Sequence, residues 1–140
     1  MRGTGLALVL ACALALSCSS TSIDGTVRID GSDSGSTVTV PLSEELEVTL
    51  RIAQPMLSCR WVITELDTAV LENTGHRLEP DDPEYMDGPE DDIWVFTPRS
   101  EGTTLLRFEW LHAGSGELCS EALGYGLPPY EVTVVVEAGE

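Results

Sequence analysis

Cys59 and Cys119 are the residues of this chain with the clearest chemistry, because a cysteine can form a disulfide or bind a metal ion. In an exported protein, two cysteines that lie outside the N-terminal leader most often form a disulfide. Closing a loop of about 60 residues stabilises the fold by about 4 kcal/mol. The alternative is a zinc site in which His76 and His112 join the two cysteines, but no C-x-x-C or H-x-x-x-H spacing is present. We therefore predict a disulfide, with no metal and no other cofactor.

A second group of candidate ligands is the acidic, proline-rich segment 79–92. Its carboxylates could attract calcium, but the segment lacks the D-x-D-x-D-G spacing with a closing glutamate that a calcium loop requires. Because such a composition cannot pack as a regular element, we predict a solvated loop.

Motifs for enzymatic chemistry are missing from the sequence. Gly114-Ser115-Gly116 lacks the flanking pattern of a nucleophile elbow, and there is no phosphate-binding glycine loop, HExxH helix or dinucleotide fingerprint. We therefore predict that the protein is not an enzyme and acts by binding.

The N-terminus has the pattern of a secretory signal peptide. Arg2 precedes an apolar run over residues 6–16, which is too short to span a bilayer, and a small residue stands before Cys18. The segment 15–18, Ala-Leu-Ser-Cys, resembles the lipobox of bacterial lipoproteins, in which the cysteine becomes the lipidated first residue of the mature chain.

This resemblance implies a signal peptide over residues 1–17, a lipidated tether over 18–23 and one domain over 24–140. It also implies an exported protein, lipid-anchored at Cys18 in the bacterial cell envelope, at the outer membrane or the periplasmic face. Ordinary cleavage that leaves a soluble, secreted protein is the alternative.

The charge of the chain limits its partners. The formal net charge is −17, there is no lysine, and loss of Arg2 with the leader makes the balance more negative still. Such a surface repels phosphate backbones and anionic headgroups, so we expect no nucleic-acid partner and no membrane contact except through the lipid anchor. A basic partner is favoured, although negative charge also simply keeps an exported protein soluble.

Short runs of β-branched and apolar residues, separated by turn signals, extend from residue 26 to the C-terminus. This pattern is typical of an all-β, immunoglobulin-like sandwich of about seven strands, and the length suits a single domain. We expect strands over residues 26–29, 37–40, 46–52, 60–64, 93–97, 103–110 and 130–136. Trp61 and Trp94 lie inside these strands and are predicted core residues, whereas Trp110 is at a strand end and could project from a loop.

The strand order and loop positions resemble those of the chagasin-like inhibitors of papain-family cysteine proteases. In that family, three loops at one end of the sandwich form a wedge that enters the protease cleft. The first loop has Asn-Pro-Thr-Thr-Gly before a strand with tryptophan, and this chain has Gln54-Pro55-Met56-Leu57-Ser58 before Trp61.

The other two loops match the family less well. The second is glycine-rich in the family, and here only Gly88, beside Asp87, remains. The third carries Arg-Pro-Trp in the family, and here Trp110-Leu111-His112 follows a leucine-to-aromatic strand.

The resemblance implies an inhibitor of papain-type cysteine proteases that acts by loop insertion, as a monomer. Residues 54–58 would form the centre of the wedge, with residues 87–88 and 110–112 on either side. The disulfide would tie two of these loops together, or would only stabilise a small secreted domain. A non-inhibitory envelope module that binds a basic protein through the same sandwich is the alternative function, and a carrier of a metal or small molecule is a third.

Overall fold

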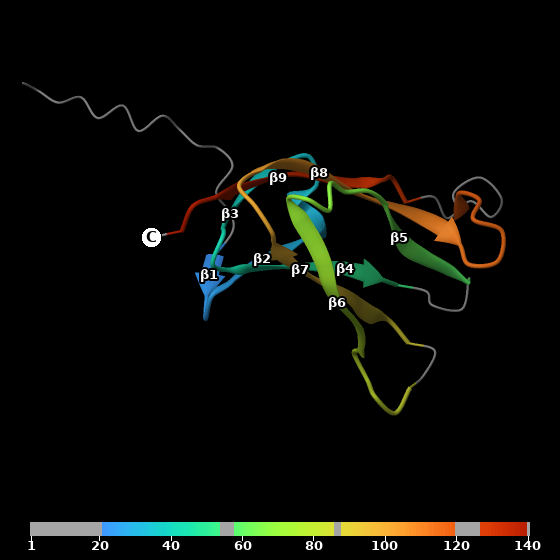
Figure 1. Ribbon diagram of the computed structural model, residues 1–140. Helices are drawn as coiled ribbons and strands as arrows, with labels where there is room; N and C mark the ends of the chain where they lie inside the picture. Colours follow the sequence, from blue (N-terminus) through green and yellow to red (C-terminus); the bar gives the residue numbers. More distant parts are fainter. Residues whose placement is uncertain (1–20, 54–57, 86–87, 120–126, 140) are drawn as a thin grey trace, which may run out of the picture.

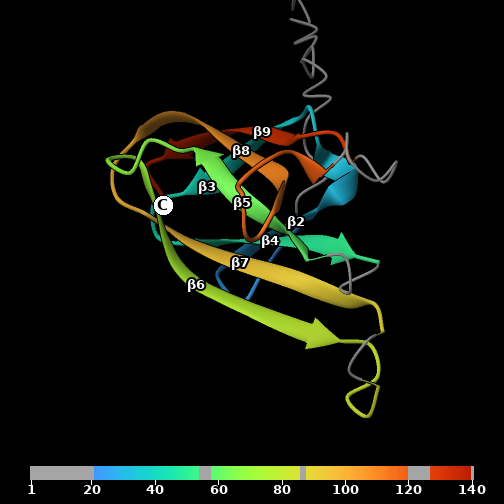
Figure 2. The ribbon, with the colours of Figure 1, turned by 90° about the vertical axis from the view of Figure 1, so that its right-hand side faces the viewer.

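The computed structural model describes residues 21–53, 58–85, 88–119 and 127–139. Within these residues, nine strands form two packed antiparallel-rich sheets (Figure 1, Figure 2). In sheet order, the five-stranded sheet contains β1 (Thr21–Ile23), β2 (Thr26–Asp30), β4 (Glu45–Ile52), β7 (Glu90–Pro98) and β6 (Leu71–Pro80). The four-stranded sheet contains β3 (Thr37–Pro41), β9 (Tyr130–Glu137), β8 (Gly102–His112) and β5 (Cys59–Glu65).

Two of the strand pairs, β2 with β4 and β3 with β9, are parallel, and the other pairs are antiparallel. A short 3-10 helix, Gly31–Asp33, lies where the chain leaves β2 for the other sheet. Asp30 caps this helix, because its side chain accepts from Ser32 N while Asp33 accepts from Asp30 N.

Alternation of apolar side chains builds the core between the two sheets. In β4, β8 and β9, every second residue is buried. Phe108 lies at the centre, with ring centroids 5.3 Å from Trp94, 6.3 Å from Phe96 and 6.0 Å from Tyr130. The Tyr130 hydroxyl donates to the carbonyl oxygen of Asp30 at 2.8 Å and so connects the two sheets.

The predicted immunoglobulin-like β-sandwich is confirmed, and all seven predicted strands are present. Two further strands were not predicted: β1, within the stretch expected to be a tether, and β6, which forms one edge of the five-stranded sheet. The segment 79–92 is therefore not a loop throughout, because Glu79 pairs with Asp91 and Pro80 with Glu90 in the β6–β7 hairpin. Only residues 81–89 connect the two strands.

Trp61 and Trp94 both contribute to the core, Trp61 as a buried residue and Trp94 as a partly buried one packed against it. No helix in the described part of the chain is long and apolar enough to cross a bilayer.

Candidate functional site

Three connections leave the strands at one end of the sandwich, and we name them the first loop (53–58), the second loop (81–89) and the third loop (113–129). The strand register brings them together. Ile52, before the first loop, pairs with Glu90, after the second loop, and Cys59, after the first loop, pairs with His112, before the third. In Figure 1 these ends of β4, β5 and β8 lie on the right-hand side, and the end of β6 lies below them, where the β6–β7 hairpin projects.

Most of the predicted centre of the wedge, Gln54, Pro55, Met56 and Leu57, lies outside the described residues. Ser58, the last predicted residue of this group, is exposed and has a φ of 56°. This left-handed conformation is uncommon for a residue with a side chain and turns the chain sharply into β5. The carbonyl of Ser58 accepts from Ala113 N at 2.8 Å, so the first loop contacts the third.

The third loop begins later than the sequence suggested. Trp110 does not project, because it continues the inward alternation of β8, is only 4% exposed and has its ring 5.2 Å from that of Trp61. Leu111 is half-buried, and His112, the last residue of β8, is exposed. His112 N donates to Glu117 O at 2.8 Å, which closes a turn at the start of the third loop.

The predicted disulfide between Cys59 and Cys119 is confirmed. The two Cα atoms are 6.2 Å apart, and both residues are buried. Because Cys59 follows the first loop and Cys119 lies in the third, the bond connects two of the three loops. It also excludes the zinc alternative with these cysteines, and the described residues contain no other group of three His, Cys, Asp or Glu side chains suited to a metal.

The second loop is held together by its own backbone. Asp81 N donates to Pro89 O at 3.0 Å and Tyr85 N to Asp82 O at 3.0 Å, which closes the loop at its base and forms a turn within it. Gly88 is buried, and a Cβ atom there would lie 2.7 Å from Cδ1 of Tyr85, so the glycine makes room for this ring. Asp87, the other predicted residue of this loop, lies outside the described residues.

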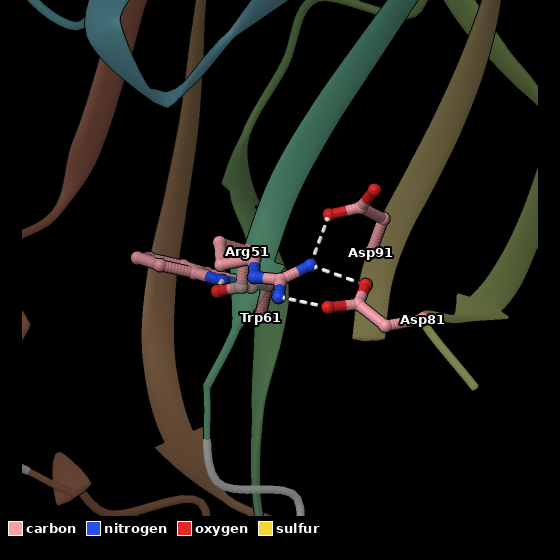
Figure 3. Close-up of polar contacts among 4 residues, drawn as sticks. All are labelled: Arg51, Trp61, Asp81 and Asp91. Carbon is pink, nitrogen blue, oxygen red and sulfur yellow. Dashed lines mark hydrogen bonds and ion pairs between the residues drawn. The ribbon is translucent and has the colours of Figure 1, made fainter. Parts of the chain in front are cut away.

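Arg51, near the end of β4, connects this strand to the second loop and to β7 (Figure 3). Its Nη1 donates to Asp81 Oδ1 at 2.7 Å and to Asp91 Oδ1 at 3.1 Å, and its Nη2 donates to Asp81 Oδ2. The hydrogen bonds from this guanidinium lower the pKa of Asp81 below its usual range. The carbonyl of Arg51 accepts from Trp61 Nε1 at 3.4 Å, so the same residue also contacts β5. We call Arg51, Asp81 and Asp91 the Arg51 clamp.

Comparison with solved structures identifies the architecture. The cysteine protease inhibitor EhICP2 from Entamoeba histolytica has a TM-score of 0.62 at 17% identity, over 80% of this chain and 96% of that one. Amebosin has a TM-score of 0.60 at 15% identity, over 79% and 96%. PbICP-C, solved in complex with falcipain-2, has a TM-score of 0.51 at 11% identity, over 84% and 95%. The chain has the chagasin-like fold. No family model matches the sequence, and neither does any curated protein.

In this chagasin-like sandwich, the sequence-predicted residues that the structure describes at the loop end are Ser58, Gly88, Leu111 and His112. Sequence reasoning missed Arg51, Asp81 and Tyr85. Arg51 occupies an outward position of a predicted strand, and Tyr85 stands in a segment predicted only to be solvated. An aromatic residue inside an acidic, proline-rich loop is the signal that could have identified Tyr85.

The open edge of the chagasin-like sandwich, between β5 and β6, contains a cleft of about 360 Å³. Its lining is mostly apolar and includes Trp61 and Trp94. It also contains a polar pair of an exposed histidine and a buried carboxylate, in which His76 Nε2–H donates to Asp92 Oδ1 and the His76 ring stacks on Trp94 with centroids 3.9 Å apart. Burial raises the pKa of the Asp92 carboxyl, and His76 lowers it by a smaller amount.

Proposed function

We propose that this protein inhibits papain-family cysteine proteases by inserting its first loop into the active-site cleft, with the second and third loops on either side. The observation that carries the proposal is that the strand ends flanking the three loops lie at one end of a chagasin-like sandwich, with the Cys59–Cys119 disulfide joining the end of the first loop to the third. The solved proteins with this fold include a cysteine protease inhibitor and a protein in complex with falcipain-2, and the similarity extends over nearly their whole length.

Inhibition of this kind is steric and needs no catalytic group on the inhibitor. The loops must instead keep one shape before and after binding, because ordering them during association reduces affinity. The disulfide and the backbone hydrogen bond from Ala113 to Ser58 restrict the third loop relative to the first, and the Arg51 clamp restricts the second loop relative to β4. In this proposal the protein is not an enzyme, and its loops already have their binding conformation before the protease arrives.

Titration of papain and a cathepsin-type protease with the domain starting at Ser19 tests this function. We expect loss of peptide hydrolysis at nanomolar to micromolar protein, and a loss of potency of at least about tenfold when Met56 and Leu57 are both changed to glycine, as expected for removal of central contacts. Leu42→Gly is the matched control, because Leu42 is an exposed apolar residue in the β3–β4 turn at the opposite end of the sandwich. Absence of inhibition at every reachable concentration would reject the proposal.

A non-inhibitory envelope module is the second candidate function, and the first loop favours it, because Met56-Leu57-Ser58 replaces the Thr-Thr-Gly of the family. Replacing these three residues with Thr-Thr-Gly separates the two functions. We expect the replacement to strengthen protease binding if the loop end is an inhibitory wedge. No change against a protease that binds chagasin-like inhibitors supports the module.

We also propose that the protein is exported and lipid-anchored at Cys18 in a bacterial cell envelope. The expected result of Cys18→Ser is loss of metabolic labelling with a fatty acid and loss of the protein from the membrane fraction. Equal labelling of the variant and the wild type would contradict the anchor, and a wild-type protein found only in the medium would support ordinary cleavage.

A further inference from the structure

We infer that Tyr85 is a contact residue by which the second loop binds the partner protein, and that Arg51 is the positioning residue that holds Tyr85 in place. This inference rests on the proposed function, since it names a binding residue and a partner chemistry for the same end of the sandwich. The two parts depend on separate observations, one about the aromatic ring and one about the clamp.

Tyr85 has the exposure and setting of a binding residue. It is 61% exposed, more than any other large hydrophobic residue that the structure describes. A single exposed aromatic residue is common on protein surfaces and by itself indicates nothing. Here, however, the ring rests against Gly88, where a Cβ atom would lie 2.7 Å from Cδ1 and 3.5 Å from Cε1. The ring is thus exposed on one side and supported on the other.

The backbone of the second loop fixes the residue that carries this ring. Tyr85 N donates to Asp82 O, and Tyr85 O accepts from Gly88 N at 3.3 Å. In the same turn, Glu84 N donates to Asp82 Oδ1 at 3.0 Å. Tyrosine has few rotatable bonds, so a supported ring on a closed loop loses little conformational entropy when it binds.

The Arg51 clamp fixes the loop as a whole. Asp81 is the first residue of the second loop and Asp91 is the second residue of β7, so one guanidinium joins both sides of the hairpin to β4. The fork geometry of arginine is needed, because a lysine ammonium cannot present two parallel donors to one carboxylate, as Nη1 and Nη2 do to Asp81. Figure 1 and Figure 2 show the hairpin projecting beyond the two layers of the sandwich, where β4 is its neighbour in the sheet. Without the clamp, the second loop keeps only its own backbone hydrogen bonds and the ladders of its two flanking strands.

The charges around Tyr85 specify the partner surface. Asp82 and Glu84 are exposed on the same turn, and no arginine in the described ranges forms an ion pair with either. A partner that receives Tyr85 must therefore place these two carboxylates near water or near cations. The surface that fits is an apolar recess with a basic rim, and opposite charges there also accelerate association.

Association and dissociation rates of the full domain with papain, measured for variants of both residues, test the inference. We expect Tyr85→Ala to weaken binding about 30-fold, as for other aromatic contact residues, and Tyr85→Phe to change it less than about threefold. Gly88→Ala should weaken binding about as much as Tyr85→Ala, because it displaces the ring. Arg51→Gln should increase the dissociation rate about tenfold, and Arg51→Lys should restore only part of this loss.

Two controls distinguish positioning from general damage. Arg99→Gln removes an exposed arginine that pairs with Glu72 at the opposite end of the sandwich, and it should leave binding unchanged. Adding Arg51→Gln to Tyr85→Ala should weaken binding by less than about threefold more, because Arg51 acts through the loop that carries Tyr85. In the free domain, Arg51→Gln should also accelerate hydrogen exchange at the Asp81 and Gly88 amides without changing the melting temperature.

The outcomes separate the two proposals. A wild-type domain that binds no papain-type protease rejects the proposed function, and with it this inference. A wild-type domain that binds, together with a Tyr85→Ala variant that binds equally well, rejects only the role of Tyr85. Full additivity of Arg51→Gln and Tyr85→Ala, or unchanged amide exchange, rejects the positioning role of Arg51.

Discussion

Replacing Cys59 and Cys119 together with alanine is expected to lower the free energy of unfolding by about 4 kcal/mol. The bond closes a loop between residues 60 apart in the sequence, and its loss lets the unfolded chain occupy many more conformations. Since a domain of this size is stable by about 5–15 kcal/mol, the change is a large fraction of the total. Urea unfolding of the wild type and the double variant, each with and without reductant, measures it.

Reductant should destabilise the wild type and leave the double variant unaffected, because the described cysteines form only this bond. A shift of less than about 1 kcal/mol between wild type and double variant would contradict the prediction, and would mean that the unfolded chain is already compact near these residues.

The same variant separates the two roles of the disulfide. If the bond prepares the first and third loops for binding, the double variant should bind a papain-type protease about tenfold more weakly at a temperature where it is still folded. A staple that only stabilises the domain would lower the free energy of unfolding and leave affinity unchanged. Leu111 and Leu118 form a β-bridge beside the bond, which keeps the local backbone comparable in the two proteins.

The sequence predicts best those strands in which apolar residues alternate without interruption. Strand β4 buries Leu46, Val48, Leu50 and Ile52 on one side, so its period of two is evident without any tertiary contact. The same rule, applied to the end of β8, would have placed Trp110 in the core, because it continues the series of Leu106 and Phe108. Its position near a strand end was misleading, since β8 continues to His112.

Strand β6 could not be predicted from periodicity. It is an edge strand whose residues from Thr74 onward are mostly exposed, and the register shifts between Asn73 and Gly75. A bulge of this kind breaks the period of two, and the strand forms because β7 supplies its hydrogen-bonding partners. Missing β6 made the acidic segment seem to be one long loop.

At the candidate site, the sequence predicted the disulfide but not the Arg51 clamp. With the proposed signal peptide removed and Cys18 lipidated, Cys59 and Cys119 have one possible connectivity, so the disulfide follows from counting. The Arg51 clamp depends on which residues of β4 and β7 lie opposite one another, and Arg51 pairs with Asp91 only in the observed register. With many carboxylates and few arginines in the chain, the sequence offers each arginine several partners of equal merit.

Asp92→Asn is expected to raise the free energy of unfolding at pH 7 by up to about 1 kcal/mol, because it removes the cost of the buried carboxylate charge. Asp92 is only 2% exposed, and burial raises its pKa in the folded protein above the ordinary value of 3.8. A carboxyl whose folded pKa is raised contributes most to stability below 3.8, and this contribution is lost as the pH rises through the folded pKa. The advantage of the variant should therefore shrink as the pH is lowered from 7 towards 4.

His76→Ala should have a larger effect, a loss of about 2 kcal/mol at pH 7, because it leaves the buried Asp92 carboxylate without the hydrogen bond from the exposed His76 Nε2. Asparagine at position 92 still offers an oxygen to His76 but carries no charge. Hence His76→Ala should cost about 1–2 kcal/mol less when combined with Asp92→Asn than it does alone. Urea unfolding of the four proteins at pH 7, 5.5 and 4 measures these differences.

Glu72→Gln is the control for this cycle, because Glu72, also in β6, forms an exposed ion pair with Arg99 just after β7, and the loss of this pair should change stability little. The stacking of His76 on Trp94 is the competing source of stability at this edge, since its ring contact does not depend on the carboxylate. An equal cost of His76→Ala with and without Asp92→Asn would assign the loss to that stacking, and the buried carboxylate would then be stabilised by something other than His76.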